Sequence, residues 1–570
     1  MSGLVKNEMI KTGKSGIIRA AIAVIIALCI ILPIGSFLMS GETTEIINDY
    51  EKWAQNADDE VEKAYYTALS RTEQFFIDNG IGYNDWRYNR YYYDLSSLER
   101  ANAIVDLVMS GAKRSDVENY FMYEDLNIAV DIDKDDNVVF SEEDYIDPFE
   151  MNETELKMQK EKTEKLVSEL RKTIASATIY DMYKQNLERC QESATFAQTA
   201  LNEAEAKLAE NPENIRFEYE RDQAKGELET ADLQLWGAME LEKNGYEYDS
   251  WQYNAINNIL SNAAFEYSRN VKMSEKLFKE SDEANYYKTY QAYCDSLDSD
   301  LRRGENAISI IRYSLEHDIP LPETLEDSAR DGFIDNLGFA VLLVGILMVA
   351  VAGTTLFSEY SGGSIRLLLI RPKSRSKILL SKLITVIIYG VIMMTVSAVL
   401  LFVLNMFCHA DKDMFVPFIT TGADGAVSVV PTVLYALVRT ATKLFSSFAV
   451  VAGAFMLSAI FAKGGIFSLM AGPVALGGAS LARIISAEIN PAFRNFAAYT
   501  ILPYLDLSVY FGNPVADYAS GGFTIFDELF GTSGVEQYFN LKTGCVIVAV
   551  HIAVFLAAAF IGFRKKQIKN

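Results

Sequence analysis

The feature that most limits what this chain can fold into is a series of long apolar runs. The first, residues 20–39 (AAIAVIIALCIILPIGSFLM), contains no charged residue. Because a helix rises about 1.5 Å per residue, twenty such residues span the roughly 30 Å hydrocarbon core of a bilayer. A cleaved signal peptide is the alternative, but its apolar core is usually about 7 to 15 residues long, and no A-x-A cleavage site follows this run.

Five further runs predict additional membrane helices. One of them is Gly-rich and contains Pro473, and such an interruption is tolerated where neighbouring helices satisfy the freed backbone groups. Together with residues 20–39 they predict six spans. The five runs are residues 336–357, 383–407, 444–462, 464–482 and 543–563.

Charge is segregated along the chain and predicts its orientation. The net charge is −24, but residues 1–40 carry +3 and residues 336–570 carry +7, so residues 41–335 hold −34. Short cytoplasmic loops are enriched in Lys and Arg. The two tails and the segment 358–382 are the basic parts, and six spans place all three on one side. We therefore expect both termini in the cytoplasm and the acidic block outside. Such an acidic chain disfavours a nucleic-acid partner.

These patterns predict a mainly α protein, with a polytopic six-helix membrane domain and a large, mostly helical extracytoplasmic domain. The expected parts are a basic tail and first span (1–40), an acidic outer block (41–335), a second span (336–357), a cytoplasmic loop (358–382) and a region with spans three to six (383–570).

The outer block has helical periodicity, with apolar residues every three or four positions over 166–174 and 228–239 and a break at Asn211-Pro212. This pattern predicts an antiparallel helical hairpin or coiled coil that projects from the membrane. We favour a solvated stalk, because a charged face at helical spacing usually indicates only exposure. Residues 85–93 concentrate Tyr and Trp, which suit either a binding surface or a subdomain core. Cys190 and Cys294 are the only cysteines of the block, so a single disulfide between them is one possibility.

Residues 131–142 (DIDKDDNVVFSE) have two interpretations. Asp131, Asp133, Asp135 and Glu142 occupy positions 1, 3, 5 and 12 of a calcium loop, but Asp136 stands where the sharp turn requires Gly. A small β-hairpin explains the same letters without a metal, and we favour it.

The basic loop between the second and third spans carries the most specific motif. Glu359 is followed by the turn residues Gly362 and Gly363 and by a short apolar segment flanked by cations, which can lie at the membrane interface or dock a partner. Lipid binding alone does not explain Glu359, because an anionic leaflet repels a carboxylate, and we expect this residue to require a protein partner. The motif comprises Glu359, Gly362, Gly363, Arg366, Arg371, Pro372, Arg375 and Lys382.

This spacing resembles that of the permease subunits of the ABC-2 type transporter family, over residues 336–570 and the first span. The resemblance implies that the loop is a coupling helix seated on a separate ATPase subunit. It also implies two ATPase copies, a second permease copy or paralogue, and a location in the bacterial plasma membrane. The chain has no G-x-x-x-x-G-K-[ST] sequence, so ATP and Mg²⁺ would be bound by the partner and no cofactor is expected in this chain.

Relatives in this family place short re-entrant helices before the last span, and residues 488–542 look similar. Pro503 and Tyr504 in that stretch are therefore candidates for the lining of a transport pathway. His551, inside the last span, is either a functional ionisable group or a neutral imidazole hydrogen-bonded within the bundle.

A second functional class stays open. The topology also resembles phage-infection-protein-like membrane proteins, which would act as anchored receptors or scaffolds without an ATPase. An enzyme is disfavoured, because the three histidines lie in separate segments and no Ser/His/Asp or Cys/His arrangement is visible. The substrate cannot be inferred from these residues.

Overall fold

The computed structural model is 82% helical, which confirms the mainly α prediction. It describes residues 2–40, 50–121, 130–132, 138–140, 147–287, 289–321, 328–361, 374–409, 413–422, 425–461, 463–488, 491–511, 515, 518 and 539–565. The chain forms two compact units. Unit 1 comprises Met1–Ser40, Phe196–Gln234 and Asn254–Asn570, and unit 2 comprises Gly41–Thr195 and Leu235–Tyr253.

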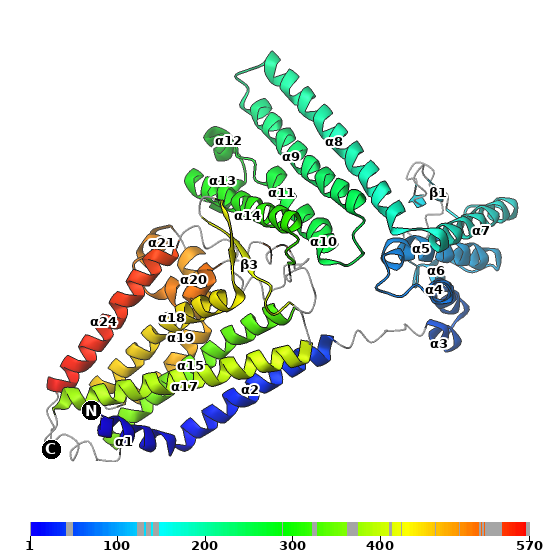
Figure 1. Cartoon of the computed structure of the whole chain (residues 1–570). Helices are drawn as coiled ribbons and strands as arrows, with labels where there is room; N and C mark the ends of the chain where they lie inside the picture. Colours follow the sequence, from blue (N-terminus) through cyan, green and yellow to red (C-terminus); the bar gives the residue numbers. More distant parts are fainter. Residues whose placement is uncertain are drawn as a thin grey trace. The chain divides into compact units, whose positions relative to one another are not determined.

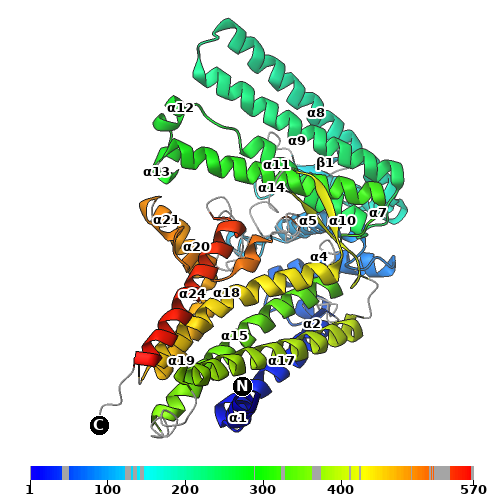
Figure 2. The ribbon, with the colours of Figure 1, turned by 60° about the vertical axis from the view of Figure 1, so that its left-hand side comes forward.

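Unit 1 contains a bundle of long apolar helices that run side by side (Figures 1 and 2). Five helices of the described residues are long and apolar enough to cross a membrane. They are α2 (Gly16–Ser40), α15 (Ala329–Ser361), α17 (Arg375–His409), α18 (Thr432–Ile460) and α24 (Leu541–Lys565). A sixth span results if two shorter helices, α19 (Gly464–Gly477) and α20 (Ala479–Glu488), are counted as one.

The bend between α19 and α20 is 64° and falls at Gly478, not at Pro473. Pro473 lies inside α19, and the helix continues through it although proline has no N–H for a helical hydrogen bond. A side chain at Gly478 would place its Cβ 2.8 Å from the Val474 carbonyl oxygen, so the tight turn requires glycine.

Helix α15 is the centre of the bundle. Two thirds of the residues in its most apolar 18-residue stretch are buried, whereas only 17% are buried in the corresponding stretch of α24. Helix α15 contacts α2, α17, α18 and α19. Glycines allow the backbones of α15 and α19 to approach closely: a Cβ at Gly465 would lie 2.4 Å from the Gly353 carbonyl oxygen, and one at Gly472 would lie 2.5 Å from Val349. Small residues at such crossings are a common way for membrane helices to pack.

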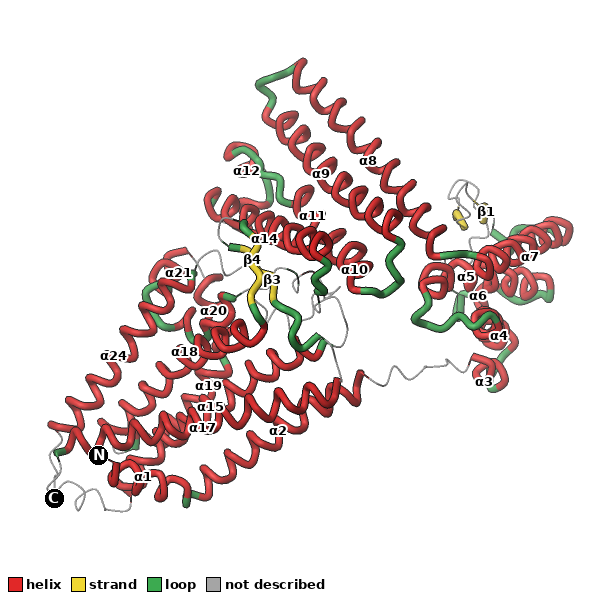
Figure 3. Tube along the Cα trace, in the orientation of Figure 1, coloured by secondary structure: helices red, strands yellow, loops and turns green. Residues whose placement is uncertain are grey.

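Between α17 and α18 the chain forms an antiparallel hairpin of two strands, β3 (Phe418–Thr421) and β4 (Val427–Val430), which the sequence analysis did not predict (Figure 3). Phe418 stacks on Tyr435 of α18 at a centroid distance of 4.0 Å. On Phe418 lies the buried guanidinium of Arg330, 3.9 Å from the ring centroid. Arg330 also donates to the Pro417 carbonyl oxygen at 3.2 Å and to Asp331 at 2.9 Å. These contacts hold the start of α15 against the hairpin.

The last loop of unit 1, before α24, contains α21 (Pro491–Ala497) and two 3₁₀ turns, η3 (Leu502–Tyr504) and η4 (Leu507–Tyr510). Among the elements of unit 1 that contact α14 (Tyr290–His317) are the π-helical turn η1 (Ala255–Leu260), α11 (Ser261–Arg269), α12 (Glu275–Glu280) and α13 (Glu283–Tyr287). Helix α10 (Trp251–Asn254), which precedes η1, lies almost entirely in unit 2.

Two long helices, α8 (Ile179–Glu210) and α9 (Ile215–Asn244), run antiparallel on either side of the turn at Asn211-Pro212 (Figures 1 and 2). The buried positions of α9 include Ala224, Ala231 and Ala238, which recur every seven residues, whereas Met239 is half exposed. The predicted hairpin is therefore present, but alanines rather than the larger apolar residues form its buried stripe.

Unit 2 is built on three helices, α4 (Glu60–Asp78), α5 (Trp86–Met109) and α7 (Glu153–Ser176), in which α5 contacts both others. Each begins at a side-chain cap, and Asn152 with Glu155 forms a complete capping box at α7. The apolar stripe at 166–174 packs here rather than in the long hairpin. The smaller elements are α3 (Tyr50–Gln55), α6 (Arg114–Val117), β1 (Val130–Ile132) and β2 (Val138–Phe140).

Two alternatives left by the sequence concern residues of unit 2. Trp86 and Tyr91 are buried in a cluster with Phe76, and the Tyr88 and Tyr92 rings are stacked at 4.8 Å, so most aromatics of residues 85–93 form a core. Strands β1 and β2 pair antiparallel, which agrees with the hairpin interpretation of residues 131–142. Asp133, Asp135, Asp136 and Glu142 lie outside the described residues. Cys190 and Cys294 are free thiols.

Candidate functional site

The N-terminal tail folds into a helix, α1 (Ser2–Gly13), that packs against α17 at the end of the bundle that carries both termini (Figure 1). The Tyr389 hydroxyl donates to the Met9 carbonyl oxygen at 3.1 Å. At the turn into α2, Arg19 Nε donates to the Gly13 carbonyl oxygen at 2.8 Å. A Cβ at Gly13 would lie 2.8 Å from the Tyr389 hydroxyl, so a larger residue at this position would displace the Tyr389 side chain.

A buried lysine joins α1 to the ends of α15 and α17. The ammonium group of Lys382 is fully buried and donates to Glu8 Oε2 at 2.8 Å, to the Thr355 carbonyl oxygen at 3.1 Å and to Glu359 Oε1 at 3.5 Å. Lys11 pairs with the same oxygen of Glu359. We call Glu8, Lys11, Glu359 and Lys382 the ion cluster.

The ion cluster is electrically balanced. It contains two carboxylates and two ammonium groups, and the side chains of Lys382 and Glu359 are 0% and 2% exposed, while that of Lys11 is 52% exposed. A buried charge is tolerated only when it is paired and hydrogen-bonded, and Lys382 satisfies this condition with three oxygen acceptors. Its position near the last turn of α15 also places a cation at the negative end of a helix.

The structure brings together two of the eight residues predicted from the loop motif. Glu359 lies in the last turn of α15 and Lys382 in the second turn of α17, so the pair joins the two ends of the loop. Arg375, the first residue of α17, donates to the Arg564 carbonyl oxygen near the end of α24 at 3.2 Å. Gly362, Gly363, Arg366, Arg371 and Pro372 lie outside the described residues.

Glu359, for which the sequence predicts a protein partner, is paired with cations of its own chain. Two of these cations are Lys11 of α1 and Lys382 of α17.

Sequence reasoning missed Glu8 and Lys11, because the tail was treated only as a basic segment. Their spacing of three residues, which places both on one face of a helix, was the available signal. The pairing itself connects residues that are 374 and 348 positions apart, and no local pattern indicates it.

The predicted pathway residues occupy a different part of unit 1. Tyr504 is buried in η3, where its ring packs so closely on α24 that a Cβ at Gly544 would lie 2.6 Å from it. Pro503 is buried beside it, and its carbonyl oxygen accepts from the Tyr510 hydroxyl at 3.0 Å. His551 lies about two turns further along α24, with Nδ1 2.8 Å from the Ile547 carbonyl oxygen. This contact agrees with the hydrogen-bonded alternative for His551.

Among the described residues, no group of three or more His, Cys, Asp or Glu side chains is arranged to hold a metal ion. The ion cluster consists of paired ammonium and carboxylate groups. Its chemical capacity is electrostatic: it fixes α1, α15 and α17 relative to one another at the two ends of one loop.

Comparison with known proteins agrees with the predicted family resemblance. The model of the family described as ABC-2 family transporter protein matches residues 148–568, nearly three quarters of the chain. This match begins inside the acidic block, which the resemblance over residues 336–570 and the first span did not include, and it leaves the first span out. "Uncharacterized protein YhcI" of Bacillus subtilis (strain 168) is 26% identical over 282 residues, which are 48% of this chain and 79% of that protein. No solved structure matches. With the motif, the apolar bundle and a family match over most of its length, this chain belongs to the ABC-2 transporter family.

Proposed function

We propose that this chain is the membrane-spanning permease of an ABC exporter, in which a separate ATPase subunit docks on the loop 358–382 and drives transport of a substrate across the plasma membrane. The observation that carries this proposal is the ion cluster. Glu359 and Lys382 stand at the two ends of the loop, and their pairing ties both ends to α1. A force applied to the loop would therefore reach α15 and α17 together rather than one helix alone.

The position of α15 supports a coupling role for this loop. It is the most buried of the candidate spans and contacts four neighbouring helices, so a displacement of its end would be transmitted through most of the bundle. Closely packed interiors transmit strain because their elements move as bodies. In this proposal ATP binding and hydrolysis occur in two partner subunits, and two permease chains move against each other.

Charge supports the orientation in this proposal. Basic residues gather on α1, at the start of α17 and at the end of α24, and the contacts of α1 and Arg375 join these helix ends. They are Lys11, Arg375, Lys382, Arg564 and Lys565. Short basic segments favour the cytoplasmic side. The end of the bundle that carries both termini is therefore the side on which the ATPase would dock, and the acidic block lies outside.

The proposal is tested by co-expressing the chain with its candidate ATPase and measuring copurification and ATP hydrolysis. Glu359→Ala, Lys382→Met and Arg371→Ala are expected to reduce permease-stimulated hydrolysis at least severalfold. The matched control is Lys443→Gln. It removes a largely buried ammonium group whose Nζ lies 3.0 Å from Asp506 Oδ2, in a part of the sequence outside the loop. Wild-type assembly and stimulation in the three loop variants would refute coupling through this loop and favour a receptor or scaffold without an ATPase.

A further inference from the structure

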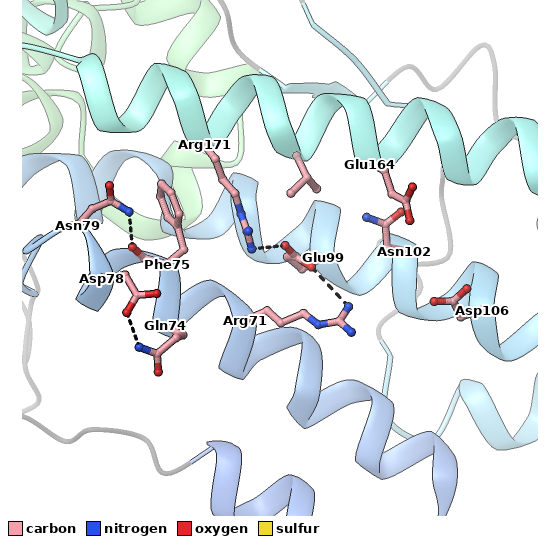
Figure 4. A pocket seen from close by; sticks show the side chains of 11 residues that line it. Arg71, Gln74, Phe75, Asp78, Asn79, Glu99, Asn102, Asp106, Glu164 and Arg171 are labelled. Carbon is pink, nitrogen blue, oxygen red and sulfur yellow. Dashed lines mark hydrogen bonds and ion pairs between the residues drawn. The ribbon is translucent and has the colours of Figure 1, made fainter.

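Unit 2 contains a polar cavity of about 500 Å³ between α4, α5 and α7 (Figure 4). This volume lies within the roughly 300–1,000 Å³ range of small-molecule sites. The cavity belongs to one compact unit, and its walls are three capped helices that share apolar cores. It is therefore a preformed feature of the acidic block, independent of the membrane bundle and of the ATPase coupling proposed above.

At the centre of the wall is a buried carboxylate, Glu99, which is 4% exposed. Arg171 Nη2 donates to Glu99 Oε1 at 2.7 Å, and Arg71 Nη1 lies 4.0 Å from Oε2. The Arg171 guanidinium also lies over the Phe75 ring, 5.2 Å from its centroid. Burial raises the pKa of Glu99, and Arg171 and Arg71 oppose that shift. Both arginine charges are thus engaged by one carboxylate of the protein.

Two buried polar atoms of the wall have no hydrogen-bond partner. They are Asn102 Oδ1, an acceptor on a side chain that is 6% exposed, and Arg171 Nε, a donor. Asn102 lies three residues after Glu99, on the same face of α5. A buried polar atom left unsatisfied costs about 1–3 kcal/mol. An apolar side chain of similar volume at position 102 would avoid that cost, so helix packing alone does not account for Asn102.

The charge of the wall selects the sign of a ligand. The lining contains four carboxylates (Asp78, Glu99, Asp106, Glu164) and two arginines, a formal charge of −2. Beside it, Lys160 pairs with Asp106 and lies 3.9 Å from Glu164. With Lys160 included the formal charge is −1, which still repels an anion more than a cation. An anion would meet the same carboxylates and two arginines that Glu99 already engages.

We propose that this cavity binds a small cationic ligand of the amino-acid amide or short-peptide class. Its ammonium group donates to Asn102 Oδ1 and faces the acidic wall, and its carbonyl oxygen accepts from Arg171 Nε. The ligand supplies a partner for each of these two buried atoms. The acidic block is then a receptor for cationic peptidic compounds.

The test uses the full-length protein in nanodiscs and isothermal titration with Lys-Ala amide. We expect saturable binding with one site per chain. N-acetyl-alanine amide, which lacks the cations, and inorganic phosphate are expected to bind at least tenfold more weakly. No saturable heat with Lys-Ala amide, or tighter binding of phosphate, would overturn the proposal.

Variants of α5 locate the binding. Asn102→Leu is expected to weaken Lys-Ala amide binding at least tenfold while the melting temperature stays equal to or above that of the wild type. The matched control is Asn89→Leu, an identical exchange on the same helix at an exposed residue outside the cavity, and its affinity should be unchanged. Asn102→Asp, which is isosteric, is expected to tighten binding severalfold. Unchanged affinity in both Asn102 variants would contradict the assignment, whether or not the protein binds the probe elsewhere.

Discussion

At the residue scale, the ion cluster depends on Lys382, whose ammonium group donates hydrogen bonds to Glu8, to Glu359 and to a helix carbonyl oxygen. We expect Lys382→Met to lower stability by about 3–5 kcal/mol, because removal of one partner leaves a buried charge uncompensated. Thermal melting in detergent measures the effect. In the triple variant Glu8→Gln, Glu359→Gln, Lys382→Met the unpaired charges are gone, so the loss should be smaller. A single variant as stable as the wild type would show that the cluster is not structurally important.

Arg330 provides a second residue-scale prediction. Its guanidinium is planar and stacks on Phe418, so Arg330→Lys keeps the charge but loses the stacked geometry. For a desolvated cation over a ring we expect a loss of about 2 kcal/mol. A double-mutant cycle with Phe418→Leu, measured by chemical unfolding, should give a coupling energy well above the roughly 0.3–0.5 kcal/mol scatter of independent sites. Strict additivity would argue against this contact.

The sequence predicted Glu359 and Lys382 as site residues but not as partners of Glu8 and Lys11. Residue type and loop position were visible in the motif, because a carboxylate near an anionic leaflet must be neutralised. The identity of the neutralising groups was not visible, because it depends on the fold-back of α1 through Gly13 and Tyr389. Asn102 has no sequence signal either, since an unsatisfied acceptor is defined only by its surroundings.

At the scale of elements, hydrophobic runs predicted the long helices well, because bilayer thickness and helix rise fix the required length. Elements governed by other forces were missed. The hairpin of β3 and β4 consists of four-residue strands beside an apolar helix, and its FITT and VSVV segments are too short to stand out. The bend at Gly478 was masked by the more obvious Pro473.

The contact between α15 and α19 is the clearest element-scale target. In Gly465→Ala the new Cβ would lie 2.4 Å from the Gly353 carbonyl oxygen and 2.6 Å from Phe357 Cβ, so the helices must separate. We expect a loss of about 1–3 kcal/mol, as for other overpacked cores. The matched control, Gly477→Ala at the other end of α19, has no atom within 4 Å of the new Cβ. Equal melting temperatures of the two variants would contradict the close approach.

At the scale of the whole molecule, the proposed orientation places α1 in the cytoplasm and α8, which belongs to the acidic block, outside the cell. In a background without the five native cysteines, Phe196→Cys introduces a thiol at a position that is 76% exposed on α8, and Lys6→Cys introduces one on α1. A membrane-impermeant maleimide should label Phe196→Cys in intact cells and Lys6→Cys only after permeabilisation. The reverse pattern would invert the topology.

The tie between the two ends of the loop also has a consequence for protein engineering. Because Glu359 and Lys382 hold α15 and α17 in place through Glu8 and Lys11, the exit and re-entry points of the chain are set outside the intervening loop. The residues between them can then be replaced as one segment while the helices of the bundle keep their packing. Chimeras that graft this segment from relatives should fold as the parent does and differ in the ATPase that they accept.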